Sequence, residues 1–96
     1  MLNNLIEVLE NKGYGYKFRN LYRIDIEFID FSSVIMILNN CYKVYIVDNN
    51  NDDDNIIEFK EFIYPINIIN YIENIWEKFQ YEKDDNYLSS STYSKI

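Results

Sequence analysis

The alternation of apolar and charged residues between positions 22 and 47 constrains the fold of this chain more than any other feature. In residues 22–28 every second residue is apolar, and the residues between them, Arg23, Asp25 and Glu27, are charged. This is the two-residue period of a β-strand that has one buried face and one face in water. The segment therefore predicts a half-buried strand.

Two polar pairs divide the rest of this segment. Ser32-Ser33 and Asn39-Asn40 are residue types that suit tight hairpin turns. The apolar run 34–38 between them is typical of a central strand, and residues 41–47 alternate again. We therefore predict three consecutive antiparallel strands with turns at the two polar pairs.

Amphipathic helices are predicted at both ends of the chain. Leu2, Leu5, Ile6 and Leu9 recur at helical spacing, and Gly13 is placed to end this helix in a left-handed cap. Pro65 suits the first turn of a second helix, whose apolar stripe runs over residues 66–81. The remaining predicted elements are an aromatic strand at 14–18, a turn or bulge at 19–21 and a strand at 56–63. A helix is the competing interpretation of the last segment, because Phe59, Phe62 and Ile63 also have helical spacing.

The predicted fold is α+β, a single antiparallel sheet of four to five strands with an N-terminal and a C-terminal amphipathic helix, in the order α-β-β-β-β-(β)-α. Residues 1–82 form one compact domain, and residues 83–96, which lack periodicity, form a mobile polar tail. Two helices can cover only one face of a sheet. The face left open is expected to carry a mixture of charged and aromatic side chains: Arg23, Asp25, Glu27, Lys43 and Tyr45.

Charge is distributed unevenly along the 96 residues, whose formal net charge is −7. Residues 1–47 contain five basic and five acidic side chains, whereas residues 48–96 contain four basic and eleven acidic ones. A negative field repels nucleic-acid phosphates and favours basic partners. The acidic half is therefore either a candidate interaction surface or a region whose charge serves only solubility.

The residues that most enzymes use are scarce. The chain has no histidine, its single cysteine, Cys41, is predicted to be a buried thiol in a strand, and no glycine-rich phosphate loop is present. Asp25 and Glu27 would lie about 6–7 Å apart on one side of a strand, which is a common arrangement on sheet surfaces. We therefore expect no enzyme and no cofactor. The absence of a signal-peptide pattern and of a long apolar stretch predicts a cytoplasmic protein.

Two further sequence patterns suggest a metal site and nucleic-acid binding, but each has a simpler explanation. Asn50, Asp52, Asp54 and Glu61 match four positions of a calcium-binding loop, but Asn55 occupies the position that requires glycine, so a solvated loop is expected and no metal. Lys17, Arg19 and Arg23 alternate with aromatic residues, as in single-strand nucleic-acid binders. Because alternate residues face opposite sides of a strand and the net charge is negative, direct nucleic-acid binding is not expected.

The function that the sequence favours is a small, acidic, protein-binding module. The sixteen isoleucines, fourteen asparagines and ten tyrosines indicate an A/T-rich genome, and a phage or mobile-element inhibitor of the anti-CRISPR or anti-defence type fits this bias. Its partner would be a larger, basic, nucleic-acid-binding protein. The alternative is a structural or regulatory homo-oligomer, such as a homodimer. The predicted partner-binding residues are Asp52, Asp53, Asp54, Glu58, Glu61, Glu73 and Glu77.

Overall fold

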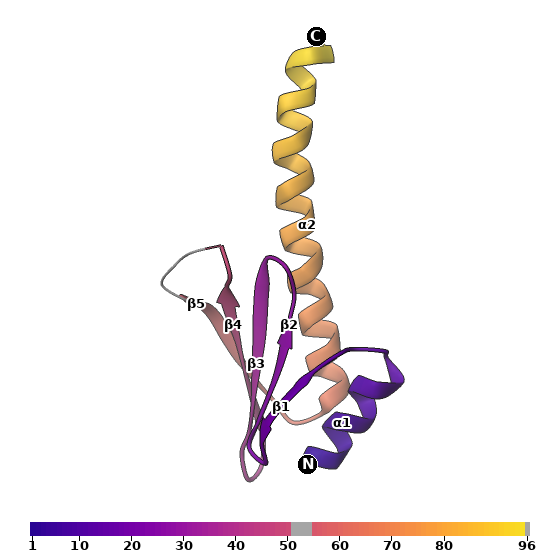
Figure 1. Cartoon of the computed structure of the whole chain (residues 1–96), viewed down its shortest axis with the longest axis vertical. Coiled ribbons are helices and arrows are strands. Elements are labelled where there is room, and N and C mark those ends of the chain that lie inside the picture. Colours follow the sequence, from indigo (N-terminus) through magenta and orange to yellow (C-terminus); the bar gives the residue numbers. More distant parts are fainter. Residues whose placement is uncertain (51–54, 96) are drawn as a thin grey trace.

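The computed structural model describes residues 1–50 and 55–95, with side chains up to residue 80. It contains one five-stranded antiparallel sheet whose strand order follows the sequence, and two helices lie on one side of the sheet (Figure 1). The predicted α+β architecture is therefore confirmed. The elements are α1 (Leu2–Asn11), β1 (Lys17–Asn20), β2 (Arg23–Glu27), β3 (Phe31–Ile37), β4 (Tyr42–Asp48), β5 (Ile56–Phe62) and α2 (Pro65–Lys95).

The register of the strands sorts their side chains onto two faces. Ile35 in the central strand β3 pairs with Ile24 of β2 and with Val44 of β4, and all three are fully buried on the face that the helices cover. Burial of such apolar side chains is the main stabilising contribution in a domain of this size. The buried apolar residues are Leu5, Leu9, Ile24, Ile26, Phe31, Ile35, Ile37, Tyr42, Val44, Ile46, Ile68, Ile69, Ile72 and Ile75.

Aromatic rings close the end of this core near the β2–β3 turn. The ring of Phe31 stacks between those of Phe28 and Phe79, with centroid distances of 4.6 and 5.1 Å. At the other end, the Tyr42 hydroxyl donates a hydrogen bond to the Met1 carbonyl oxygen at 2.6 Å. These contacts fix α1 and α2 against the sheet.

The predicted left-handed cap of α1 is confirmed. Gly13 has a φ of +77°, and the Tyr14 N–H donates to the Leu9 carbonyl oxygen at 3.0 Å. A side chain at this φ would bring Cβ close to the backbone, which explains why glycine stands here.

One predicted turn is wrong and one is confirmed. Ser32-Ser33 lies inside β3, and the β2–β3 turn is at Ile29-Asp30, where the Phe28 N–H donates to the Phe31 carbonyl oxygen. Buried and half-buried side chains alternate from Phe31 through both serines, and this strand periodicity outweighs the preference of serine for turns. The turn at Asn39-Asn40 is present, closed by the Leu38 N–H and the Cys41 carbonyl oxygen at 2.9 Å.

The first strand and Cys41 also differ from the prediction. The strand expected at 14–18 lies at Lys17–Asn20, because only these residues reach β2; the predicted irregularity is a bulge between Phe18 and Asn20. Cys41 lies in the β3–β4 turn, one residue before β4, and is half-buried.

Helix α2 is longer than predicted. The apolar stripe ends near Tyr81, but the helix continues to Lys95 and projects beyond the sheet (Figure 1). No glycine or proline follows Pro65, so nothing in the backbone chemistry stops the helix earlier. The molecule is accordingly elongated, at 55 × 29 × 20 Å. The mobility expected for residues 83–96 stays a prediction.

Candidate protein-binding face

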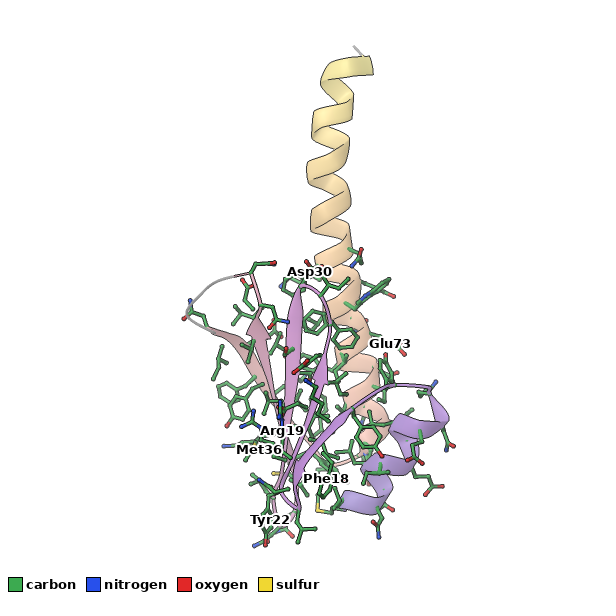
Figure 2. All side chains as sticks on the ribbon, viewed as in Figure 1. Phe18, Arg19, Tyr22, Asp30, Met36 and Glu73 are labelled. Carbon is green, nitrogen blue, oxygen red and sulfur yellow. The ribbon has the colours of Figure 1, made fainter. Side chains whose placement is uncertain are left out.

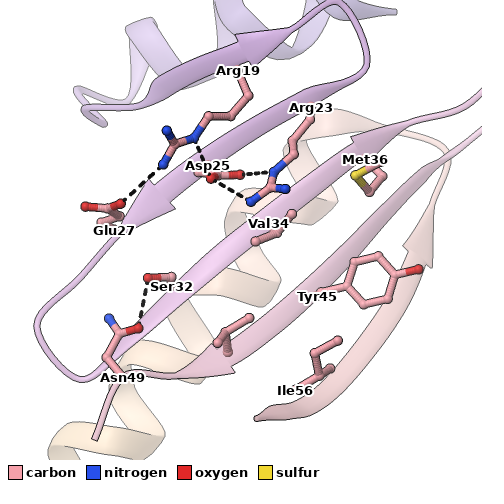
Figure 3. Close-up of a pocket in the computed structure, with 11 residues that line it drawn as sticks. Arg19, Arg23, Asp25, Glu27, Ser32, Val34, Met36, Tyr45, Asn49 and Ile56 are labelled. Atoms are coloured by element: carbon pink, nitrogen blue, oxygen red, sulfur yellow. Dashed lines mark hydrogen bonds and ion pairs between the residues drawn. The ribbon is translucent and has the colours of Figure 1, made fainter. Parts of the chain in front are cut away.

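The side of the sheet that the helices leave uncovered is the candidate site, and we call it the open face. Its strand side chains border a shallow depression of about 550 Å³ (Figure 3). The residues that line the depression are Arg19, Arg23, Asp25, Glu27, Ser32, Val34, Met36, Tyr45, Val47, Asn49 and Ile56. All five residues expected on this face are outward-facing by the strand register, and Lys43 and Tyr45 are partly exposed.

Cross-strand register builds the open face in rows. In one row Asp25 pairs with Val34, Val34 with Tyr45, and Tyr45 with Phe59. Neighbouring Cβ atoms in such a row are about 5 Å apart, so these side chains contact one another across four strands. The row therefore runs from a charged end at β2 to an apolar end at β5.

The charged end of the open face is a carboxylate held by two guanidinium groups. Asp25 accepts from Arg19 Nε at 2.8 Å, from Arg23 Nε at 2.9 Å and from the terminal Nη2 of Arg23 at 3.0 Å. The two arginines cover Asp25 so well that it is only 4% exposed although no helix lies over it (Figure 3). Fixed guanidinium groups on a sheet surface are a rigid polar rim for the depression.

Two opposing effects set the pKa of Asp25. Burial disfavours the charged form and raises the pKa, whereas the hydrogen bonds and positive charges of Arg23 and Arg19 lower it, and the net shift is downward from 3.8. Asp25 is thus a stable anion at neutral pH. Among the described residues it is the only buried acidic side chain, and its low pKa makes it a poor general acid or base.

Further ion pairs neutralise the basic strip that suggested nucleic-acid binding. Lys17 Nζ lies 3.0 Å from a Glu27 carboxylate oxygen, and the second oxygen of Glu27 lies 3.7 Å from Arg19 Nη2. The three cations of the strip therefore face two carboxylates on the same strands. The alternating aromatic residues do not form one stacking platform, because Tyr14 and Tyr16 pack against the core whereas Phe18 and Tyr22 are exposed.

The other part of the open face is apolar. Val34, Met36 and Val47 form its half-buried floor, and the rings of Tyr45 and Phe59 lie 5.7 Å apart at its β5 side. Phe59 is 60% exposed and Ile56 58% exposed. An exposed apolar area bounded by polar groups is typical of protein-interaction surfaces.

Asn49 holds the end of the depression next to the β2–β3 turn. Its Nδ2 donates to the Phe28 carbonyl oxygen at 3.0 Å, its N–H donates to the Asp30 carbonyl oxygen, and its Oδ1 accepts from the Ser32 hydroxyl at 3.1 Å. The turn and the end of β4 are therefore fixed to each other, and this edge of the open face is preorganised.

The acidic residues predicted to bind a partner do not share one described surface. Glu58 lies on the helix-covered face of β5 and accepts from the Tyr71 hydroxyl, whose pKa is raised by burial and by this carboxylate. Glu61 lies on the open face, 3.6 Å from Lys43 Nζ. Glu73 accepts from Tyr14 at 3.3 Å on α2, and Glu77 is exposed on the same helix. Asp52, Asp53 and Asp54 lie outside the described residues.

Within residues 1–50 and 55–80, no three histidine, cysteine, aspartate or glutamate side chains are grouped to hold a metal ion. Two of the four residues that match a calcium-binding loop, Asp52 and Asp54, lie outside that range. Neither described helix has the length and apolarity needed to cross a membrane.

Comparison of the chain with protein-family models, with curated proteins and with solved structures gave no match.

The apolar floor of the open face was missed at the sequence level. The run from Val34 to Leu38 indicated a central strand, which is confirmed, but it also contained the signal for a second apolar face. Val34 and Met36 point away from the helices and still sit beside Tyr45 and Val47 of β4. A strand that is apolar on both sides, next to a strand that alternates, predicts an apolar area on the open face.

Proposed function

We propose that this chain is a non-enzymatic protein-binding module and that the open face is its binding surface. The observation that carries the proposal is the depression itself. There the side chains of Val34, Met36 and Tyr45 adjoin the fixed cluster of Arg19, Asp25 and Arg23. Apolar centres with polar rims, and tyrosine and arginine in particular, are enriched where proteins bind one another. The domain is built to present this surface rigidly.

A non-enzymatic role is supported by how the polar groups of the open face are used. Asp25 is occupied by three charge-assisted hydrogen bonds, and Glu27 is paired with Lys17. Carboxylates held by cations in this way position a binding surface, and the ion pairs stabilise their charged form, which disfavours proton transfer to or from a substrate.

The partner we propose is a larger, basic, nucleic-acid-binding protein. The net charge of −7 would draw such a partner from a distance, and the apolar floor would hold it after contact. An inhibitor of the anti-CRISPR or anti-defence type acts in this way, by occupying a surface that nucleic acid needs. In this proposal the acidic side chains Glu73 and Glu77 contribute to the field, whereas the open face makes the close contact.

Affinity capture with a matched pair of variants tests the proposal. The tagged chain is used as bait in a lysate of its host at low and high salt, and the retained proteins are quantified by mass spectrometry. Tyr45→Ala removes a ring from the centre of the open face, and Tyr22→Ala removes an exposed ring at the end of the sheet, away from the depression (Figure 2). Both changes leave the net charge unaltered.

A basic nucleic-acid-binding protein retained by the wild type and by Tyr22→Ala should be reduced about tenfold or more with Tyr45→Ala. Capture at high salt should be weaker in all cases, because screening slows the association of a basic partner with the negatively charged chain. Equal retention by the two variants would show that the open face is not the contact, and a retained protein without basic character would refute the proposed partner class.

A further inference from the structure

The two edges of the sheet are protected to different degrees. Edge strand β1 has four residues, a bulge and the two cations Lys17 and Arg19, which are features that prevent edge pairing. Edge strand β5 has seven residues, and no described strand pairs with its outer side (Figure 1). Every second residue of β5 therefore presents its N–H and C=O to solvent at this edge.

The side chains of β5 are also unusually apolar for an exposed edge. Phe59 and Ile56 are more than half exposed on it, and Ile63 and Tyr64, which follow the strand, are 66% and 64% exposed. An edge of this length and character favours pairing with another strand. The charges on β5 indicate which strand would pair with it.

The sequence of β5 is complementary to itself when two copies run antiparallel. If Phe59 faces Phe59 of a second copy, Glu58 of each chain lies opposite Lys60 of the other, on the helix-covered side of both sheets. Opposite charges directly across a strand pair are stabilising, and like charges are destabilising. Within its own chain, Lys60 Nζ lies over the rings of Phe62 and Tyr71 but is in none of the ion pairs found among the described residues.

The same alignment extends the aromatic contact of the open face. Tyr45 and Phe59 already form a ring pair between β4 and β5. A two-fold axis through Phe59 would place the second Phe59 beside the first and give a row of four rings across the joined sheets. Aromatic cross-strand pairs of this kind add to the stability of a sheet.

Shifts of this alignment by one residue in each chain are less favourable. Centring the pair on Glu58 or on Lys60 would place two identical charges opposite each other. A register that pairs Lys60 with Glu61 of the other copy cannot form. Directly opposed residues of antiparallel strands point to the same face of the sheet, whereas Lys60 points to the helix-covered face and Glu61 to the open face, and two copies paired through the same edge have their helices on the same side.

We propose that the chain forms a homodimer in which the β5 strands of two copies pair antiparallel about Phe59 and make one continuous ten-stranded sheet, with Glu58 opposite Lys60 of the second copy. The occupant of this edge is thus a second copy of the same chain. The dimer leaves both depressions of the open face accessible on the same side, so this inference is independent of the proposed partner.

Two charge reversals on the full chain, tested alone and mixed, examine the register. Glu58→Lys places lysine opposite lysine, and Lys60→Glu places glutamate opposite glutamate. Each variant alone should have a dimerisation constant about tenfold or more weaker than the wild type, measured by sedimentation equilibrium. Mixed together, they should recover dimerisation as a heterodimer, since every cross-strand charge pair then has opposite charges. Native mass spectrometry distinguishes the heterodimer when one of the two variants is uniformly labelled with a heavy nitrogen isotope.

Glu61→Lys is the matched control, because it reverses a charge on the same strand that does not face a charge in the proposed register. It should leave dimerisation within a factor of about three. A monomeric wild type overturns the proposal, as does a Glu58→Lys variant that dimerises like the wild type. Circular dichroism of each variant excludes unfolding as the cause, and recovery in the mixture shows that both chains are folded.

Discussion

At the scale of the residue, Asp25 shows how an open sheet face can contain a buried charge. Its burial comes from Arg19 and Arg23 and not from the core, so the cost of desolvating the carboxylate is offset by three charge-assisted hydrogen bonds. Removing the charge leaves two guanidinium groups with weaker partners. We therefore expect Asp25 to be the polar residue of the open face on which stability depends most.

Asp25→Asn should lower the free energy of unfolding by about 1–3 kcal/mol at neutral pH, measured by urea denaturation. Glu61→Gln, which weakens an exposed pair with Lys43, is the control and should change it by less than about 1 kcal/mol. Equal effects of the two substitutions would mean that Asp25 contributes no more than a surface ion pair.

The stabilising effect of Asp25 should also depend on pH in one direction. Because its pKa is lowered on folding, the unfolded chain binds the proton more readily, and stability rises with pH between the two pKa values. The contribution is complete above the unfolded pKa near 3.8 and is lost as the pH falls through the lower folded value. The advantage of the wild type over Asp25→Asn should therefore begin to decrease below about pH 4 and should continue to decrease as the pH falls further, and an advantage that does not change with pH would contradict the assignment.

Ser33 is the opposite case, a buried polar group without a partner. Its hydroxyl lies on the helix-covered face, between Ile26 and Ile46, and makes no hydrogen bond with the described residues. Ser33→Ala should raise the free energy of unfolding by about 1 kcal/mol in urea denaturation, since it removes an uncompensated desolvation cost. Ser32→Ala is the control on the other face, where the hydroxyl donates to Asn49, and it should give no gain.

At the scale of the element, the local sequence was sufficient wherever side-chain periodicity and backbone chemistry agree. The helix after Pro65 and the cap at Gly13 were both predictable for this reason. The turn at Ser32-Ser33 was mispredicted because residue preference and periodicity disagreed, and strand pairing decided in favour of periodicity. Elements with two consistent local signals are those that a single sequence specifies.

The candidate site was less predictable because it depends on register between distant strands. Asp25 and Tyr45 belong to one row only through the pairing of β2 with β3 and of β3 with β4. The sequence predicted that both residues lie on the open face, because their positions in the alternating strands indicate it. The partner-binding residues, in contrast, were predicted from their negative charge alone. Glu58 and Glu61 show why charge alone was insufficient, since these two residues of one strand point to opposite faces of the sheet.

The two glycines of the chain allow the cap of α1 to be tested. Both have open space where a Cβ would be, but only Gly13 has a positive φ. Gly13→Ala should therefore lower the free energy of unfolding by about 1 kcal/mol, whereas Gly15→Ala should be neutral or slightly stabilising, as measured by thermal or urea unfolding. An equal loss at both positions would point to something other than backbone conformation.

Helix α2 should be divisible into a part that the fold requires and a part that it does not. Among the helix side chains that the structure describes, up to residue 80, the last buried one is Ile75 and the last one packed against the core is Phe79, and the helix then projects beyond the sheet (Figure 1). A chain ending at Glu82 should keep the free energy of unfolding of the full chain within about 0.5 kcal/mol, because ordinary surface changes have effects of that size. A larger loss in urea denaturation would show that residues 83–96 belong to the folded domain.

At the scale of the whole molecule, apolar surface is covered on one side of the sheet and left accessible elsewhere, including two places to which this structure lets a binding role be assigned. The helices cover one face, while the open face and the β5 edge remain uncovered. We assign the open face to a partner and the edge to a second copy. Both assignments use short-range contacts, and the net charge of −7 acts at longer range on either.

The net charge of the chain should therefore affect the association rate of the proposed partner, whereas the contacts of the open face should affect its dissociation rate. Added salt should lower the association rate with little effect on dissociation, because screening weakens the steering of a basic protein by the negative field. Tyr45→Ala should instead raise the dissociation rate about tenfold, since it removes a close apolar contact without changing the charge. Surface plasmon resonance with the captured partner measures both rates, with Tyr22→Ala as the control. If salt changed only dissociation, the charge would act within the contact and not as a steering field, and the open face would have to be assigned a direct electrostatic role.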